Sequence, residues 1–456
     1  MIVLVLVVDS LRADAPGFGG GEALTPTMDA LAAGGTLYEQ AIASAGWTVP
    51  SLNAIAAGTF PHRIGVARWR HPYPRRRPTL FSAFAQAGFE VFSFFHNQRW
   101  AFAGSQQRGT VGDSRDRDAI LAALRAPRGS DRLVFVHHWY THLPYLNESM
   151  TRTKWKGACD AILAELADDP GRRPYWRRKY LDTVEYLDEQ LLPAYLEAAR
   201  SGGDDVLVCL TADHGENWGE SLPAGETVNH IYDLHGRWLT DDTTHVPLVF
   251  FGGRRGAEVA AGQRLGGFAR GVDVAPTVCA LAGVPWPGEL VDIEAETLID
   301  RGIATVADLS LDGVSLEASL RAGEPAPTTQ ALTVTSNNAI VPAKYPRAGQ
   351  KLWRRYSIRT AEARYVWDGV DRTRHVQGPD GELHRASRWG GVLRDRITGA
   401  GGLYREMARE RTEAVDAGKM LDKALFPGAG DDDASLDDAA APDLAESMRM
   451  LGYTDD

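Results

Sequence analysis

The sequence predicts an α/β fold in which helices cover both faces of a parallel or mixed sheet, followed by a smaller antiparallel subdomain. Apolar, β-rich runs alternate with helical patterns through the first two-thirds of the 456-residue chain. Continuous apolar strands separated by helices are typical of a sheet buried on both faces. The expected strands of this part are Ile2–Val8, Glu90–Phe95, Leu133–His137, Asp205–Leu210 and Pro247–Phe251.

Proline and glycine mark the expected helices. A Thr-Pro pair precedes a helix over Met28–Ala33, and a Gly-Gly pair follows it. The same design recurs over Val274–Leu281, where Pro276 stands in the first turn and Gly283 comes after the last. Both segments are therefore expected to be short helices with sharp ends.

The pattern changes at about residue 330. Ala331–Thr335, Tyr356–Arg359 and Arg364–Trp367 are expected to be short strands, the last two forming a hairpin, which indicates an antiparallel subdomain. The acidic, alanine-rich segment over 428–443 indicates a flexible linker. We therefore expect a main domain over 1–300, a smaller α+β subdomain over 301–427, and an acidic linker with a terminal helix over 428–456.

Composition excludes several classes of protein. The net charge is −11, whereas non-specific nucleic-acid binding needs a basic surface. The sequence has no apolar run of the roughly 18 residues that a transmembrane helix needs. The apolar start, Met1–Val8, lacks the basic region and cleavage site of a signal peptide, so we interpret it as a strand and expect a cytoplasmic protein. The three cysteines (Cys159, Cys209 and Cys279) have no metal or disulfide spacing and are expected to be buried and inert.

Three polar groups directly follow expected strands, at the edge where ligands gather in an open parallel sheet. Asp9 and Ser10 follow the first strand, Asp213 and His214 follow the fourth, and the histidine-rich segment His137–His142 follows the third. Each alone has a structural interpretation, as a helix cap, a turn or core histidines. Together at three strand ends they favour a functional site.

A fourth element is the segment from Gly46 to Asn53. Thr48 stands where the N-cap of a helix running to Ala57 is expected, and an N-cap hydroxyl usually serves the helix itself. The functional alternative is a helix N-terminus that holds a tetrahedral anion next to Thr48. A threonine hydroxyl needs a base or a metal to become a nucleophile. Asp9, Asp213 and His214 could supply that metal.

These segments resemble the sulfatase family of the alkaline phosphatase superfamily. Val8–Asp14 followed by Thr25–Ala32 is similar to the family's opening, in which a metal-binding aspartate ends the first strand. Trp47–Ser51 aligns with its nucleophile motif. Further segments that resemble family motifs, in the same order, are Gly58–Val66, Phe135–Tyr145, Thr211–Glu216, His235–Val249, Gly271–Val278 and Met450–Tyr453. The resemblance is specific over residues 1–285 and looser beyond.

The resemblance implies an alkaline-phosphatase-like fold and a metal-dependent ester hydrolase or phosphotransferase. It makes Asp9, Thr48, Asp213 and His214 the ligands of one divalent metal ion and Thr48 the nucleophile. The remaining histidines of the site, His142 and His235, would contact the transferring group, with His235 the better candidate to protonate the leaving oxygen. One imidazole among the ligands favours manganese or zinc, with magnesium or calcium also open. The expected substrate is an anionic small-molecule, lipid or glycan ester.

Two departures from the family pattern decide the favoured chemistry. True sulfatases carry a cysteine or serine, the precursor of formylglycine, where Thr48 stands, and an arginine where Leu52 stands. A direct threonine nucleophile resembles the phosphodiesterases and phosphoglycerol transferases of the superfamily, so we favour a phosphate (di)ester cleaved through phosphothreonine. A sulfuric ester hydrolase without formylglycine and a non-catalytic anion-binding member stay open. A second metal would need Asp242 or His245 to turn inward.

Three other segments carry weaker signals. The basic run from Arg68 to Arg77 is interpreted as a solvated loop, with an anion-steering rim as the alternative. His96-Asn97 stands where many relatives carry a substrate-binding lysine. The insertion after the third strand is a candidate lid that determines substrate choice. Its aromatic and basic residues are Trp155, Trp176, Arg172, Arg173, Arg177 and Arg178.

Overall fold

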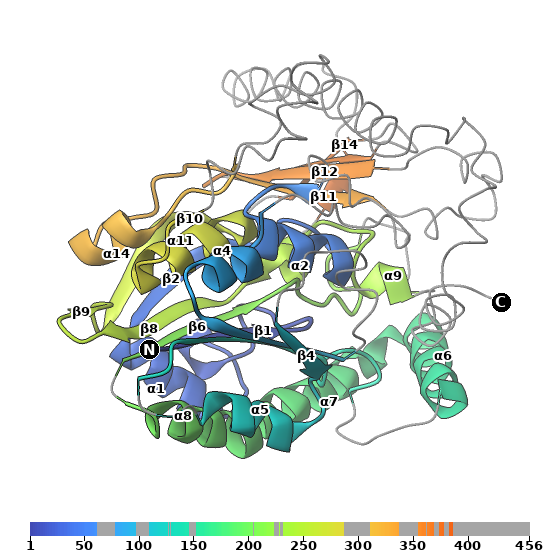
Figure 1. Ribbon diagram of the computed structural model, residues 1–456. Coiled ribbons are helices and arrows are strands. Elements are labelled where there is room, and N and C mark those ends of the chain that lie inside the picture. Colours follow the sequence, from blue (N-terminus) through green and yellow to red (C-terminus); the bar gives the residue numbers. More distant parts are fainter. Residues whose placement is uncertain are drawn as a thin grey trace, which may run out of the picture.

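The computed structural model describes residues 1–61, 78–96, 109–125, 127, 129–145, 152–203, 205–222, 228, 231–286, 311–336, 354–361, 363–368, 374–377 and 383–385. These residues form a large mixed sheet between two layers of helices, with a second, smaller sheet (Figure 1). The basic run from Arg68 to Arg77, Asn97 and the acidic segment from residue 428 lie outside the described residues. Predictions for them, and the three domain boundaries, stay predictions.

The main sheet has ten strands among the described residues, in the order β10-β2-β8-β6-β1-β5-β3-β4, with β7 beside β2 and β9 beside β8. β1 (Ile2–Val8) lies between β5 (Arg132–His138) and β6 (Val206–Ala212) and is parallel to both. β3 (Glu90–Phe95) is parallel to β5. The five expected strands are confirmed, and the fifth, β8 (Leu248–Arg254), runs antiparallel to β6 and makes the sheet mixed.

Five described strands of the main sheet, three of them four residues or longer, were not predicted from the sequence. β2 (Thr36–Ile42) and β10 (Gln263–Arg270) pair in parallel near one edge, and β4 (Thr110–Asp113) forms the other edge. Strands near an edge are partly solvated, and none of the three has a continuous apolar run. The register between β10 and β2 also shifts between Leu265 and Phe268, across a Gly-Gly pair. The short strands of this sheet are β7 (His245–Val246) and β9 (Ala257–Glu258).

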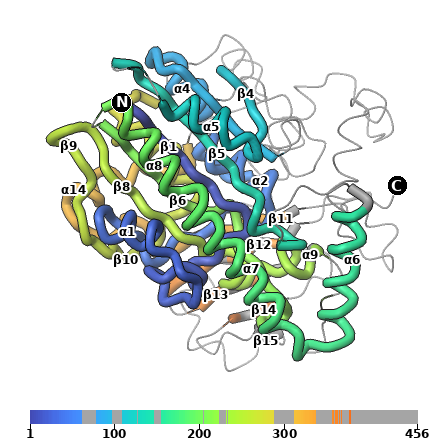
Figure 2. Tube along the Cα trace, turned by 90° about the horizontal axis from the view of Figure 1, so that it is seen from below, coloured from blue at the N-terminus to red at the C-terminus, as the bar shows by residue number. Residues whose placement is uncertain are grey.

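Helices cover both faces of the main sheet, as Figures 1 and 2 show. α2 (Thr48–Ala57), α4 (Leu80–Gln86) and α11 (Val274–Ala282) pack together on one face. α1 (Pro26–Gly34) and α8 (Leu192–Arg200) contact each other on the opposite face. The other helices are η1 (Gly17–Gly19), α5 (Arg117–Leu124), α6 (Arg152–Asp168), η2 (Pro170–Arg172), α7 (Arg173–Tyr186), η3 (Leu187–Leu191), α9 (Ile231–Leu234), α10 (Asp241–Thr244), η4 (Gly271–Asp273) and α14 (Glu317–Ala322).

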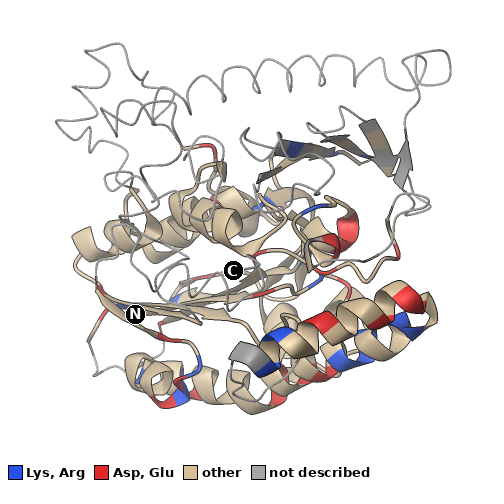
Figure 3. Ribbon diagram, turned by 90° about the vertical axis from the view of Figure 1, so that its right-hand side faces the viewer, with Lys and Arg blue, Asp and Glu red and all other residues tan. Residues whose placement is uncertain are grey.

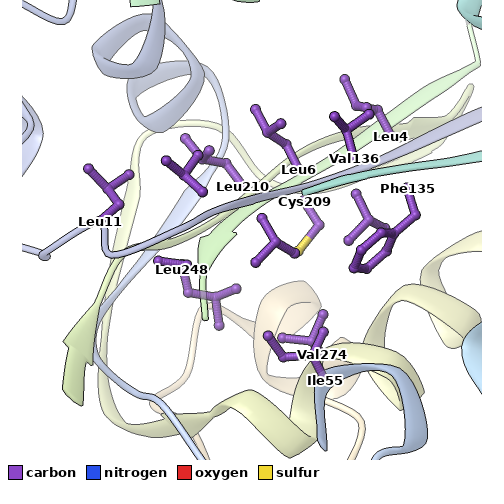
Figure 4. Packing of buried hydrophobic residues seen from close by; sticks show 14 of the residues in the cluster. Leu4, Leu6, Leu11, Ile55, Phe135, Val136, Cys209, Leu210, Leu248 and Val274 are labelled. Carbon is purple, nitrogen blue, oxygen red and sulfur yellow. The ribbon is translucent and has the colours of Figure 1, made fainter. Parts of the chain in front are cut away.

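The core lies on both faces of the central strands, because successive strand residues point to opposite sides. In Figure 4, Cys209 points toward Ile55 of α2 and Val274 of α11, whereas Leu210 points to the other face. All seven residues of β1 are buried, as the continuous apolar run predicted. The buried, unpaired cysteines also match the prediction: Cys159, Cys209 and Cys279.

The smaller sheet has five antiparallel strands among the described residues, in the order β11-β12-β13-β14-β15 (Figure 1). The predicted hairpin is β12 and β13, and β11 pairs with β12. The bounds are β11 (Ala331–Ser336), β12 (Arg354–Arg359), β13 (Arg364–Asp368), β14 (Arg374–Gln377) and β15 (Leu383–Arg385). Within the described part of the chain, no helix combines the length and apolar character needed to cross a membrane.

Candidate functional site

Two aspartates leave the main sheet side by side. β1 and β6 are parallel and in register at Val8 and Ala212, so Asp9 and Asp213 follow the same edge of the sheet. Both carboxylates are fully buried. The Ser10 amide donates to Asp213 Oδ1 at 3.1 Å, and the Ser10 hydroxyl donates to Asp9 Oδ1 at 2.7 Å. Ser10 has a φ of 56°, a left-handed conformation that costs a non-glycine residue energy.

Thr48 faces these carboxylates. Trp47, not Thr48, is the N-cap of α2, so the N-cap prediction was wrong by one residue. Because Thr48 already lies in the first turn, its side chain is free to point out of the helix. Its Oγ1 lies 3.2 Å from Asp9 Oδ2 and 3.1 Å from His214 Nε2. The side chain is 1% exposed, so these contacts are shielded from bulk water.

His137 joins the aspartates, although sequence reasoning placed it only in a histidine-rich segment. Asp9, His137 and Asp213 each offer a ligand atom within 4.8 Å of the others. His137 Nε2 lies 3.4 Å from Asp9 Oδ2 and 3.5 Å from Asp213 Oδ2. Burial alone would lower the pKa of His137, but the two carboxylates outweigh it and raise the pKa to about 9.

The donor atoms suit a divalent cation. Ligands about 2.1 Å from a tetrahedral metal lie about 3.4 Å from one another, close to the separations at His137. His214 Nε2 is 3.5 Å from Asp213 Oδ2 and 3.9 Å from Asp9 Oδ1, so it borders the same space. Among the described residues, Asp213 Oδ2 and His137 Nε2 have no hydrogen-bond partner although both are buried. Two buried carboxylates need a compensating positive charge, and these residues fit a metal.

The second half of the site is a buried hydrogen-bonded chain. His235 Nδ1 is 2.8 Å from Glu216 Oε1. The other oxygen of Glu216 accepts from the Tyr145 hydroxyl at 3.1 Å, and that hydroxyl accepts from Trp218 Nε1 at 2.8 Å. Burial raises the pKa of Glu216 to about 8. The His235 ring packs against His214, with ring centroids 4.7 Å apart, which links the two halves.

His142 lies beside His235, with ring centroids 5.2 Å apart. Its Nδ1 is 2.7 Å from the Leu143 carbonyl oxygen, which can only accept, so Nδ1 carries the proton and Nε2 has the lone pair. Burial lowers the pKa of His142 to about 4. At neutral pH His142 is therefore an uncharged acceptor at Nε2.

Three residues considered for extra roles lie elsewhere. Asp242 is 3.2 Å from the Arg12 guanidinium, and His245 Nε2 contacts the Glu39 carbonyl at 2.8 Å, so neither turns toward the aspartates. His96 stacks on Trp139 with centroids 4.1 Å apart, and burial lowers its pKa to about 3. A neutral imidazole does not replace a cationic lysine.

The insertion reaches the site through one tryptophan. Trp155 of α6 stacks on Trp139, which in turn stacks on His142 at 4.4 Å. Basic and acidic residues are interspersed along α6 and α7 (Figure 3). Three of the insertion's arginines form ion pairs with carboxylates: Arg172 with Glu165, Arg177 with Glu22, and Arg178 with Asp182 and Glu185. The insertion therefore supports the histidines with aromatic rings, while these arginines are already partnered.

The mixed α/β fold, with its large central sheet between helices, is alkaline-phosphatase-like. The family model named Sulfatase matches residues 2–284. The chain belongs to the sulfatase family. The predicted resemblance and fold class are confirmed.

Similar proteins come from sequence and structure comparison. The chain is 26% identical, over 253 residues, to the low-salt glycan biosynthesis sulfotransferase Agl7 of Haloferax volcanii, covering 53% of this chain and 54% of that protein. The match thus spans about half the length of this curated relative. The phosphonate monoester hydrolase of Agrobacterium radiobacter superposes with a TM-score of 0.64 at 17% identity, covering 90% of this chain and 95% of that one. A 2-O GAG sulfatase superposes with a TM-score of 0.65 at 15% identity, covering 93% of each chain. At these identities the structures show the fold alone.

Proposed function

We propose that this chain is a metal-dependent enzyme that cleaves a phosphate ester, with a diester favoured, through a covalent Thr48 intermediate. The observation that carries the proposal is the Thr48 hydroxyl, buried 3.2 Å from Asp9 and 3.1 Å from His214. His214 Nδ1 faces the Gly215 carbonyl at 2.9 Å, so its proton belongs on Nδ1 and its Nε2 lone pair faces Thr48. A carboxylate and a lone pair beside the hydroxyl favour loss of its proton.

Asp9, Asp213 and His214 would hold one divalent cation together with the Thr48 oxygen, and His137 extends this predicted set. When bound, the cation would lower the pKa of the hydroxyl and neutralise charge on the ester. Two imidazoles beside two carboxylates favour manganese or zinc over magnesium or calcium.

His235 is the proposed acid. In the first step the deprotonated Thr48 oxygen bonds to phosphorus, the bond from phosphorus to the leaving oxygen breaks, and His235 protonates that oxygen. Glu216 supports this role, because a carboxyl with a pKa of about 8 keeps a proton within the Glu216–His235 pair near neutral pH. In the second step water or an acceptor hydroxyl attacks phosphorus, gives its proton to His235 and releases Thr48.

His142 is proposed to contact the transferring group from the side of His235. As a neutral acceptor at Nε2, it suits a hydroxyl of the leaving group or of the attacking molecule better than an anionic oxygen. Substrates with hydroxyl groups next to the ester, such as glycan esters, meet this requirement.

A sulfate ester or sulfuryl transfer is the second candidate. It is favoured by the similarity to a glycan biosynthesis sulfotransferase over half of the chain. Because threonine cannot become formylglycine, this reaction would also use the Thr48 hydroxyl directly.

The test uses metal-loaded protein with aryl phosphodiester, phosphomonoester and sulfate ester substrates. We expect Thr48→Ala to lower kcat at least about a thousandfold, and Thr48→Ser, which keeps a hydroxyl, to retain most activity. Peptide mapping of protein quenched during turnover should find a phosphoryl group on Thr48. Unchanged turnover in Thr48→Ala would refute the nucleophile, and turnover of sulfate esters alone would favour the second candidate.

A further inference from the structure

We propose that strand β11 of the small sheet is a positioning element that sets the location of His235 relative to Thr48. The inference rests on the proposed function, in which these two residues act as acid and nucleophile. It concerns residues that lie outside the polar cluster and belong to a different sheet.

β11 binds the segment that leads into the nucleophile helix. The Thr333 hydroxyl donates to the Ala43 carbonyl at 2.7 Å, and the Val334 amide donates to the Ser44 carbonyl at 3.0 Å. Ala43 and Ser44 follow β2 directly and precede Thr48 by only a few residues. Figure 1 shows β11 above α2. The start of α2 is therefore held from the side of the small sheet as well as from the main sheet.

The same strand binds the residue after the proposed acid. The Thr335 hydroxyl donates to the Gly236 carbonyl at 2.8 Å, and Thr335 is fully buried. Gly236 has a φ of 86°, and a Cβ atom there would lie 3.4 Å from the Cβ of Trp47. The backbone next to His235 thus packs against the N-cap residue of α2. Thr333 and Thr335, two residues apart on one strand face, reach the nucleophile segment and the acid segment respectively.

Two other strands of the small sheet contact the residues that follow His235. Arg355 of β12 donates to the Arg237 carbonyl, and its guanidinium lies 4.3 Å from the ring of the buried Trp238. Arg364 of β13, which is fully buried, lies 2.7 Å from Asp241. A buried arginine is costly unless it is paired, so this ion pair fixes the sheet against the segment that follows His235.

The expected consequence is a specific kinetic defect. A displacement of about 1 Å in a catalytic group can cost about a hundredfold in rate. If β11 positions His235, loosening it should slow only the reactions that need a protonated leaving group. Esters of alkyl alcohols need the acid, whereas esters of 4-nitrophenol, whose anion leaves unaided, do not.

The experiment compares Thr335→Val with Thr36→Val in metal-loaded protein. Thr36 is fully buried and donates to the Ala260 carbonyl at 2.8 Å, but it begins β2 at the end opposite Ala43, so it controls for the loss of one buried hydrogen bond. We expect Thr335→Val to lower kcat about tenfold on an alkyl ester and less than about twofold on the 4-nitrophenyl ester. Thr36→Val should leave kcat on both esters within about twofold of the unsubstituted protein.

His235→Ala separates the two levels of inference. If it shows no preference for good leaving groups, the proposed acid is wrong. If it shows that preference and Thr335→Val does not, the positioning role of β11 is wrong and the proposed function stands. In the double variant, Thr335→Val should add no further leaving-group effect to His235→Ala, because both changes would act on one step. An independent, additive effect would also overturn the positioning role.

Discussion

Removal of the Tyr145 hydroxyl, which belongs to the buried hydrogen-bonded chain of Glu216 and His235, should lower the free energy of unfolding. Tyr145 is 2% exposed, and its hydroxyl stands between Trp218 Nε1 at 2.8 Å and Glu216 Oε2 at 3.1 Å. In Tyr145→Phe both partners would remain buried without this bond. The ring itself is kept, so the change removes polar contacts without opening a large cavity.

The size of the effect follows from the two partners. Each buried polar group left without a hydrogen bond costs about 1–3 kcal/mol, so the two partners together should lower the free energy of unfolding of Tyr145→Phe by about 2–6 kcal/mol. In a chain of 456 residues, each kcal/mol shifts Tm by about 1 °C, so the expected fall in Tm is about 2–6 °C. Loss of the hydroxyl also removes a bond that lowers the pKa of Glu216, so that pKa should rise further above about 8.

Tyr195→Phe is the matched control. Tyr195 is 1% exposed, and its hydroxyl has no hydrogen-bond partner among the described residues. The same substitution there should leave Tm unchanged or raise it, because it removes a buried hydroxyl that gains nothing. Differential scanning calorimetry of the three proteins measures the contrast. Equal Tm values for the Tyr145 and Tyr195 variants would refute the hydrogen-bonded chain described for Glu216.

Three further outcomes are expected. His96 has a pKa of about 3 in the fold against about 6.5 unfolded, so stability should fall as pH drops below about 6.5, by up to about 1.4 kcal/mol per pH unit. His96→Gln should flatten that slope in urea unfolding at pH 7 and 5, and an unchanged slope would contradict the burial of a neutral ring. Manganese or zinc at about a hundred times its Kd should raise the free energy of unfolding by about 2.7 kcal/mol. His137→Ala should weaken binding of that metal at least about tenfold, measured by titration calorimetry. Equal metal affinity in the variant would show that His137 is not a ligand. The buried Cys159, Cys209 and Cys279 should react with a thiol reagent only after unfolding, and modification of the native protein would contradict their burial.

Strand ends were predictable where the apolar run was continuous. β1 and β3 begin and end where the sequence predicted. β1 is apolar and buried along its whole length, so its first polar residue marks the end of the strand. That abrupt change places Asp9 correctly at the end of β1. β2 was missed because Glu39 and Gln40 interrupt its apolar pattern, and solvent exposure at those positions explains why they are tolerated.

The continuous apolar runs did not predict the direction of each strand in the sheet. The apolar run of β8 reads like that of β6, yet the two are antiparallel. Both are buried in the sheet interior, so neither shows the alternation that marks a half-exposed antiparallel strand. The antiparallel β12–β13 hairpin was predictable because its turn is short and local. The contacts of the small sheet with residues 43–44 and 236–241 were not, since they join segments far apart in the sequence.

The choice between His137 and His138 could not be predicted from the sequence. Two histidines end β5, and adjacent strand residues point to opposite faces, so only one of them can face the carboxylates beyond β1. Both faces of a central strand are covered, so burial is equal: each histidine is 1% exposed. His138 points away and stacks between the rings of Tyr140 and Tyr195, with centroids 5.5 Å and 5.6 Å apart. The register that separates them depends on Val7 pairing with His137, a contact between residues 130 positions apart. A pattern of residue types identifies the strand end that carries the chemistry, but only the pairing of β1 with β5 decides which imidazole reaches Asp9.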